Sequence, residues 1–379
     1  WSGLAQSLRH ISFTSIDDDL LQDLLFLFNQ TTVHPIDITH PTLSALSHHT
    51  EFALALTLVG ALTPGSHLDY HRTAAQLSGI PLFLRLITLT HVADLKIERM
   101  LTTLRRLMLQ ETIAGKMQDD GLPFASALAL HCFTNEYVFA ETDEETLSVE
   151  HLEKKTSELV EQKQDVPSSS IVTLAAYRPL HMFDWAQGLT EHEWGKEVSA
   201  VIERQVLEPL TELSIRPQIP CLTPVQDTVS QSVRDQYEEN PCPRWVITSL
   251  FEKGEPIGAV LTAAPNRYSL GDYETPNNPE VLIAGCGTGQ HPLGTATRFK
   301  GSRVLAIDLS LSSLSYAARK TKELGVTNIE YAQADIMELG TLDRQFDLIE
   351  SSGVLHHMNE PMAGWRVLTD CLKPGGLIN

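Results

Sequence analysis

The sequence lacks long uninterrupted hydrophobic segments. Its best apolar stretch, residues 52–62, is shorter than the roughly 18 to 20 residues that a helix needs to cross a bilayer. The N-terminus, Trp1-Ser2-Gly3, has no initiating methionine and no basic, apolar and small-residue signal pattern. We therefore expect no membrane span and a cytoplasmic location, and the missing methionine leads us to expect a fragment of a longer protein.

Cysteine is scarce, and its spacing excludes the usual cysteine-based sites. The chain holds 5 cysteines, which are scattered and form neither a CxxC motif nor a Cys/His pair at zinc spacing: Cys132, Cys221, Cys242, Cys286 and Cys371. An odd, dispersed set argues against a disulfide framework. We expect free thiols in a reducing compartment and no metal site.

Positive charge is also in short supply. Lys and Arg number 28 against 48 Asp and Glu, which gives a formal net charge of −20. A surface this acidic repels nucleic acid and anionic lipid, so neither is an expected partner. Residues 278–379 hold 9 basic and 11 acidic side chains and are nearly neutral, so the charge is concentrated in residues 1–277.

The composition that is present is that of a globular protein with two or three domains. Apolar residues make up 42% of the 379 residues and charged residues 20%, which excludes wholesale disorder. Leucines at three- and four-residue spacing predict helices over residues 17–160. Aligning this region with itself at an offset of 58 matches four apolar pairs, Leu24 with Leu82 among them. A helical repeat and a plain helical bundle both remain open.

The middle of the chain is expected to be helical with two interruptions. An acidic, solvated helix is predicted over 150–164, followed by a linker over 164–170. Helical spacing resumes over 171–220, and a further helix over 222–240 is stopped by Asn240-Pro241. The Gly-, Pro- and Asn-rich segment 254–278 is predicted to be a hairpin or loop.

In the last hundred residues, the spacing of the apolar side chains is no longer that of helices alone. Short apolar runs alternate with helical stretches, which predicts right-handed crossovers and a parallel sheet. The predicted strands are 281–284, 302–307, 329–332 and 346–349, and the predicted helices are 290–299, 310–324 and 361–372.

A glycine-rich turn links the first of these strands to the first helix. Gly285, Gly287 and Gly289 follow the GxGxG spacing, which lets a ligand approach the backbone without Cβ clashes. The helix that follows presents free N–H groups to an anionic ligand group. The spacing is not the GxGxxG of dinucleotide proteins, so an NAD-linked oxidoreductase is disfavoured.

Acidic residues stand at the ends of the next two strands. Asp308 lies 19 residues after Gly289, where a carboxylate can accept hydrogen bonds from both hydroxyls of a ribose. Asp335 follows the third strand and could accept from an adenine amino group, with Ile336 against the ring. The alternatives are a helix cap for Asp308 and a turn residue for Asp335.

The loop after the fourth strand holds further polar residues. Ser351 and Ser352 follow the strand directly, beside the expected switch in strand order where ligands bind in open α/β sheets. His356 and His357 are candidates for a general base, because imidazole titrates near neutrality. Packing on the sheet or exposure to solvent is the alternative for both histidines.

These segments, together with Leu372-Lys373-Pro374-Gly375-Gly376, resemble the ordered motifs of class I S-adenosylmethionine-dependent methyltransferases. The VLHHM and LKPGG pieces resemble the branch that acts on small molecules, such as the ubiquinone and menaquinone C-methyltransferases. More loosely, residues 236–245 and 129–145 look like bacterial proteins with tetratricopeptide repeats ahead of a methyltransferase domain. By that resemblance any such repeats would precede Trp1.

The resemblance implies S-adenosyl-L-methionine as cofactor and assigns residues to it. The glycine turn would touch its methionine part, Asp308 its ribose, Asp335 and Ile336 its adenine, and the post-strand-four backbone its sulfonium end. Many relatives carry an acidic residue two positions before the first glycine, where this chain has Ile283. The implied cofactor-binding set is Ala284, Gly285, Cys286, Gly287, Gly289, Gln290, Asp308, Leu309, Asp335, Ile336, Ser351 and Ser352.

We therefore expect a helical N-terminal region (1–165), a helical linker and cap region (166–277) and an α/β Rossmann-like methyltransferase domain (278–379). By the resemblance that domain is truncated at the start of its fifth strand, which would leave strand four with an open edge. Tyr237 and Trp245 would either cover the cofactor site or simply pack on the sheet.

The expected activity is methyl transfer to a small-molecule or protein acceptor, with the helical region selecting or docking that acceptor or another protein partner. The alternative is a helical interaction module whose methyltransferase-like domain binds the cofactor without catalysis. Neither reading requires a metal.

Overall fold

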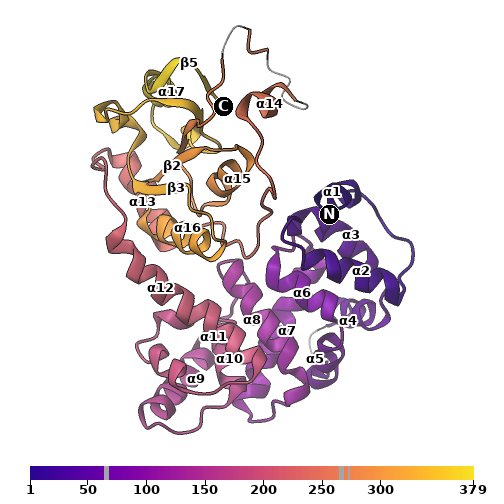
Figure 1. The fold of residues 1–379 in the computed structure, drawn as a ribbon. Helices are drawn as coiled ribbons and strands as arrows, with labels where there is room; N and C mark the ends of the chain where they lie inside the picture. The colour runs from indigo at the N-terminus through magenta and orange to yellow at the C-terminus, as the bar shows by residue number, and fades with distance from the viewer. Residues whose placement is uncertain (64–67, 264–268, 272–273) are drawn as a thin grey trace. The chain divides into compact units, whose positions relative to one another are not determined.

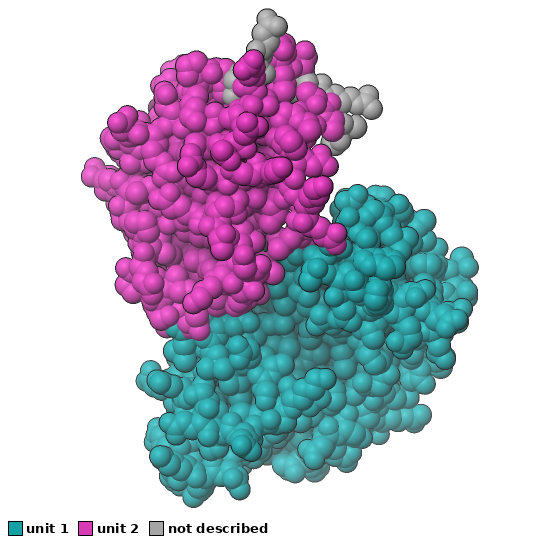
Figure 2. Space-filling view, in the orientation of Figure 1, with its two compact units in different colours: residues 1–210, 245–248 teal, residues 211–244, 249–379 magenta. Residues whose placement is uncertain are grey.

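The computed structural model describes residues 1–63, 68–263, 269–271 and 274–379. Contacts between residues divide the chain into two compact units (Figure 2). Unit 1 comprises Trp1–Leu210 and Trp245–Thr248, and unit 2 comprises Thr211–Arg244 and Ser249–Asn379. The three-part division at residues 165 and 277 stays a prediction. Within the described residues, no helix is long and apolar enough to span a membrane.

Unit 1 is built from helices, as predicted for residues 17–160 (Figure 1). Its α-helices are α1 Ser2–Leu8, α2 Asp18–Phe28, α3 Pro35–Leu46, α4 Thr50–Gly60, α5 Tyr70–Ser78, α6 Pro81–Leu89, α7 Leu95–Ile113, α8 Leu122–Thr134, α9 Asp143–Glu161, α10 Ser168–Ala175 and α11 Lys196–Ile202. Short turns η1 Asp119–Gly121, η2 Leu180–Met182, η3 Ala186–Glu191 and η4 Glu203–Leu207 connect some of them.

The core of unit 1 is organised around α8. Every residue from Phe124 to Thr134 is buried, and α8 contacts α5, α6, α10 and α11. Because this helix is buried on all sides, its sequence, LPFASALALHCFT, is mostly apolar, and its polar residues Ser126, His131 and Thr134 are buried as well.

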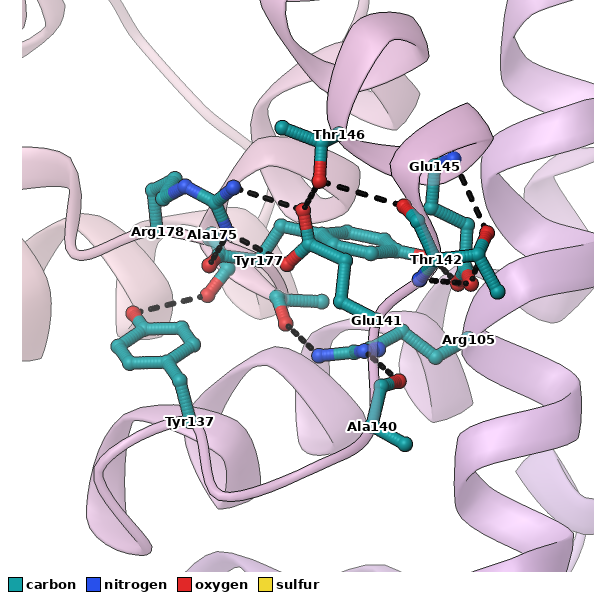
Figure 3. Close-up of polar contacts among 11 residues, drawn as sticks. Arg105, Tyr137, Ala140, Glu141, Thr142, Glu145, Thr146, Ala175, Tyr177 and Arg178 are labelled. Atoms are coloured by element: carbon teal, nitrogen blue, oxygen red, sulfur yellow. Dashed lines mark hydrogen bonds and ion pairs between the residues drawn. The ribbon is translucent and has the colours of Figure 1, made fainter.

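A polar network around Arg105 joins α7, α9 and α10 inside unit 1 (Figure 3). The Arg105 guanidinium donates to the Ala140 carbonyl at 2.8 Å and lies over the Tyr177 ring, 4.1 Å from its centroid. The Tyr177 hydroxyl in turn donates to the Glu145 carboxylate at 2.7 Å. Arg105 is 1% exposed, so its charge is stabilised by carbonyl and ring contacts inside the protein.

Two sequence boundaries in this region need correction. The acidic helix α9 starts at Asp143, earlier than residue 150, because Thr142 and Glu145 form a reciprocal capping box. The expected linker over 164–170 is wrong in its second half, since α10 begins at Ser168 and Ser170 is buried. Pro167 immediately before the helix explains the start, and the apolar run that follows explains the burial.

Unit 2 contains a five-stranded parallel sheet in the order β3-β2-β1-β4-β5. The strands are β1 Glu280–Ala284, β2 Arg303–Asp308, β3 Ile329–Gln333, β4 Phe346–Glu350 and β5 Leu372–Ile378. The first four confirm the sequence prediction. The order reverses between β1 and β4, so a crevice forms there at the carboxyl ends of the strands.

Helices cover both faces of this sheet. One apolar layer joins β1 and β2 side chains to α15 Gln290–Arg298 and α16 Leu311–Glu323, and the other packs the opposite face on α17 Pro361–Asp370 and η6 Ile336–Thr341. The remaining elements of the second half are α12 Glu208–Ile215, η5 Arg216–Gln218, α13 Thr228–Glu239, α14 Ile257–Thr262 and η7 Leu355–His357.

Strand β4 has no open edge, which corrects the expectation from the sequence. Residues 372–378 form β5 and pair with β4 in parallel, with an irregular register between Phe346 and Leu348. The LKPGG segment reads as a turn because of its proline and glycines, yet Leu377 and Ile378 pair with Leu348 and Ile349. In segment 254–278 the described residues include the short helix α14, and 264–268 and 272–273 lie outside the described residues.

Candidate functional site

A cavity of about 720 Å³ opens at the carboxyl ends of the strands of unit 2. It lies at the switch in strand order, and its walls come from the segments after β1, β2, β3 and β4, from Asn379 after β5, and from α13. Most of the predicted cofactor residues line it: Gly285, Cys286, Gly287, Gln290, Asp308, Leu309, Asp335, Ile336 and Ser352. Residues assigned by the family resemblance therefore form one wall of the cavity, and their contact with a cofactor stays a prediction.

The glycine turn adopts a conformation that favours glycine. Gly285, Gly287 and Gly289 have φ of +77°, +51° and +94°, in the left-handed region. A Cβ on Gly289 would lie 2.6 Å from the Ala317 Cβ of α16, so this glycine permits close packing of the turn on the neighbouring helix. Gly289 is outside the cavity lining, and so is Ala284, which ends β1 inside the sheet.

Asp308 points at the glycine turn. One carboxylate oxygen accepts from the Gly287 backbone N–H at 2.7 Å, and the other accepts from the Ser310 N–H at 3.0 Å. Burial raises the pKa of Asp308, although these backbone donors oppose the rise. The carboxylate thus links the segments that follow β1 and β2, and Asp308 also lines the cavity.

Asp335 follows β3 and takes the turn-residue role considered for it. Its side chain accepts from the Met337 N–H at 3.0 Å and so caps η6, which is the turn-residue alternative. It also lines the cavity beside Ile336, whose apolar side chain is buried. Its backbone N–H donates to the Thr223 hydroxyl at 2.8 Å, which fixes the loop.

Helix α13 supplies a wall that the motifs did not predict. Asp227, Val229, Ser230, Val233 and Tyr237 line the cavity from this helix and its N-cap. The Glu238 carboxylate accepts from the Leu311 N–H at 2.6 Å and from the Ser312 hydroxyl at 2.6 Å, which fastens α13 to the start of α16. Tyr237 therefore lies where a cover was expected.

The segment that follows α13 contacts the glycine turn and contributes to the cavity wall. The Thr288 hydroxyl donates to the Pro243 carbonyl at 2.8 Å, and Cys242 and Pro243 line the cavity. Trp245, the other residue considered as a cover, belongs to unit 1. In the sequence, the NPCP segment predicts that the preceding helix ends. It does not predict which part of the protein the following residues contact.

The residues after β4 divide between lining and support. Ser352, Gly353, Val354 and His357 line the cavity, whereas the Ser351 hydroxyl donates to the Ala284 carbonyl at 3.2 Å. His356 is not among the described lining residues, and its ring lies 4.0 Å from that of His357, centroid to centroid. Of the two histidines, His357 is the one that a ligand in the cavity could reach.

His291 is a lining residue that the sequence analysis missed. It occupies the first turn of α15, and its Nε2 lies 3.0 Å from a carboxylate oxygen of Glu350, the last residue of β4. Nothing in the local sequence singles out this pair, because the two residues are 59 positions apart. Strand pairing brings them together, since Glu350 pairs with Ile283 of β1, just before the turn.

The cavity is electronegative. Asp227, Asp308, Asp335 and Glu360 contribute carboxyl groups to its lining, while the described lining residues include no lysine or arginine. Such a lining favours a ligand that carries positive charge. Among the described residues no group of three His, Cys, Asp or Glu could hold a metal ion, and the five cysteines are free.

Comparisons with known proteins find that the part of unit 2 with the parallel sheet is similar to methyltransferases. A family model described as a methyltransferase domain matches residues 281–376. An uncharacterized protein of Synechococcus is 31% identical over 157 residues, which cover 40% of this chain and 37% of that protein. The (S)-coclaurine N-methyltransferase of Papaver somniferum is 32% identical over 98 residues, or 26% of this chain and 28% of the enzyme.

Among solved structures, a methyltransferase of Geobacter sulfurreducens in complex with S-adenosyl-L-homocysteine matches 27% of this chain and 40% of its own. The TM-score is 0.24 and the sequence identity 23%. The chain thus matches less than half the length of the curated relatives named above.

Proposed function

Because residues 281–376 are a class I S-adenosylmethionine-dependent methyltransferase domain, we propose that this chain binds S-adenosylmethionine in the cavity of unit 2 and methylates a small molecule or a protein group. The position of Asp308 is the observation that carries the proposal. Its carboxylate lies between the glycine turn and the cavity, where a ribose placed over the turn would meet it.

The residues present fit this cofactor. A Cβ on Gly287 would meet no atom of the described residues within 4 Å, so the ligand can approach the backbone there, whereas the space beside Gly285 is filled by Val354. Asp308 would accept from the ribose hydroxyls, and Asp335 with Ile336 would hold the adenine ring. The electronegative lining suits a ligand with a sulfonium and an ammonium group.

The chemistry that the cofactor supplies when bound is an electrophilic methyl group on sulfur. The task of the protein is then to align an acceptor with that methyl group and to exclude water, since in-line displacement depends mainly on orientation. Ser352 and Gly353 would form the wall beside the reacting atoms. Where the acceptor must lose a proton, His357 is the lining imidazole on that side.

The proposal is tested first by binding. Isothermal titration of the chain with S-adenosylhomocysteine should give one site, and titration with NAD should give no heat above dilution. Binding of NAD in preference to S-adenosylhomocysteine would contradict the proposal, because it would assign a dinucleotide to the glycine turn.

Methyl transfer is tested separately. The chain is incubated with S-adenosylmethionine labelled in its methyl group and with fractions of a cell extract, and radioactivity is followed in small molecules and in protein. Label in one fraction, lost with Asp308→Asn, would support the enzyme and indicate the acceptor class. Cofactor binding without transfer to any fraction would favour the non-catalytic binding module.

A further inference from the structure

A buried carboxylate lies directly behind the wall of the cavity. Glu350 ends β4, is 3% exposed and does not itself line the cavity. Among the described residues, those that contact its carboxylate belong to α15: His291 Nε2 at 3.0 Å, the Thr295 hydroxyl at 2.5 Å and Arg298 Nη2 at 3.0 Å. This arrangement joins one strand end to three successive turns of a single helix.

The carboxylate is held in its ionised form. Burial alone would raise the pKa of Glu350, but the hydrogen bonds from His291 and Thr295 and the charges of His291 and Arg298 outweigh it and lower the pKa. Arg298 supplies a balancing positive charge, with its Nη2 at 3.0 Å from the carboxylate.

An ionised carboxylate can only accept hydrogen bonds, which assigns the tautomer of His291. Because Nε2 faces Glu350, the proton of the neutral imidazole is placed on Nε2. The opposite nitrogen, Nδ1, then carries a lone pair. His291 lines the cavity and its side chain is 34% exposed, so the ring that carries this nitrogen lies at the cavity wall.

The surroundings of this nitrogen are suited to a zwitterion. α15 starts at Gln290, and the positive end of its helix dipole, which attracts a carboxylate, lies at the glycine turn. A lone pair one residue further along attracts an ammonium group. The neighbouring strand end offers no polar alternative, because Ile283, which pairs with Glu350, is apolar and fully buried.

We propose that Nδ1 of His291 accepts a hydrogen bond from the α-ammonium group of the bound cofactor. His291 is then a binding residue, and Glu350 is a positioning residue that fixes its tautomer and ring orientation. The inference rests on the proposed function, since it assumes that an adenosyl amino acid occupies the cavity.

The test compares two ligands that differ at one end. S-adenosylhomocysteine carries the amino-acid group, whereas 5′-methylthioadenosine keeps the nucleoside and the sulfur and lacks that group. For His291→Ala, calorimetry should show affinity for S-adenosylhomocysteine reduced about 10- to 100-fold, the range for a hydrogen bond to a charged group. Affinity for 5′-methylthioadenosine should stay within about twofold, since the lost bond is absent from that complex.

Two amide substitutions separate the ring positions. An asparagine amide reaches the position of Nδ1, and a glutamine amide reaches that of Nε2. His291→Asn should therefore retain more affinity for S-adenosylhomocysteine than His291→Gln. This pair also keeps a polar side chain at the site, so the comparison stands if His291→Ala unfolds.

The role of Glu350 is tested in the same way. Glu350→Gln should reduce affinity for S-adenosylhomocysteine more than for 5′-methylthioadenosine. The control, Thr295→Val, removes another contact to the same carboxylate outside the described cavity lining and should affect both ligands equally. Equal losses for both ligands in His291→Ala, or no loss for either, would overturn the inference, whereas failure of the unchanged protein to bind either ligand would overturn the proposed function itself.

Discussion

The polar network around Arg105 in unit 1 and the cavity carboxylates of unit 2 use their polar groups in different ways. In unit 1, the Arg105 guanidinium, the Tyr177 hydroxyl and the Glu145 carboxylate contact one another or nearby backbone groups. In unit 2, Asp308 and Asp335 use some of their hydrogen-bonding capacity on backbone N–H groups and also line a cavity. The groups of unit 1 named here find their partners inside the protein, although Arg105 Nε has none among the described residues, whereas Asp308 and Asp335 of unit 2 can still receive a ligand.

This difference indicates where stability and where binding reside. A buried network whose members pair with one another contributes to folding, and breaking it is costly. Polar groups at a cavity contribute less to folding and more to recognition. Substitutions in the two units should therefore separate the two properties.

The largest effect is expected from Arg105→Met. The change leaves the Ala140 carbonyl without its donor, about 1–3 kcal/mol, and removes a desolvated cation–π contact worth about 2 kcal/mol. Chemical denaturation should show unit 1 destabilised by about 4 kcal/mol. Arg106→Met, on the exposed side of the same helix, is the control and should change stability by less than about 0.5 kcal/mol. Equal effects of the two would contradict the account.

Acid should weaken unit 1 through His131. This side chain is 3% exposed in α8, its Nδ1 lies 2.8 Å from the Ile87 carbonyl, and burial lowers its pKa to about 4. The unfolded chain binds a proton near pH 6.5 and the folded chain does not, so stability falls as pH falls from about 6.5 to about 4. The loss should reach about 3 kcal/mol.

Denaturation at a series of pH values checks this, with His131→Gln as the variant that cannot titrate. The difference in pH dependence between the two proteins isolates the contribution of His131. Parallel stability curves over the whole range would count against the assignment.

Asp308→Asn should affect binding more than folding. The amide weakens the contacts expected with the ribose hydroxyls, and the loss should be about 100-fold in affinity for S-adenosylhomocysteine, or about 2.7 kcal/mol. The melting temperature should change little, because removing a buried charge offsets the weakened backbone contacts. Calorimetry and thermal denaturation measure the two quantities. The exposed Asp343→Asn is the control, and a similar loss there would contradict a site at Asp308.

The smallest effect is expected from Tyr177→Phe. The ring stays over Arg105 and only the hydroxyl that donates to Glu145 is lost, so destabilisation should be about 1–2 kcal/mol. Combining it with Arg105→Met in a double-mutant cycle measures how far the network is cooperative. Strict additivity would show that the two contacts are independent.

The sequence predicted the α/β half of the chain well because its signals are local. Apolar runs, a glycine turn and acidic strand ends lie within a few residues of the structure that they specify, as Gly285 and Asp308 illustrate. Each apolar run is short, as expected for a strand, and all four predicted strands are present.

What the sequence could not predict depends on contacts between distant residues. The α13 wall is fixed by Glu238 capping α16, some 73 positions away, and His291 meets Glu350 only through strand pairing. The fifth strand was expected only at the end of the chain, yet β5 starts at Leu372, because the edge of β4 selects an extended chain although Pro374 and Gly375 are typical of turns. Tertiary context decided each of these cases.

The most direct measurement is a co-crystal structure with S-adenosylhomocysteine. The account predicts the nucleoside in the cavity of unit 2, with both ribose hydroxyls within hydrogen-bond distance of the Asp308 carboxylate and the adenine beside Ile336. A ligand bound elsewhere, or a ribose turned away from Asp308, would contradict it.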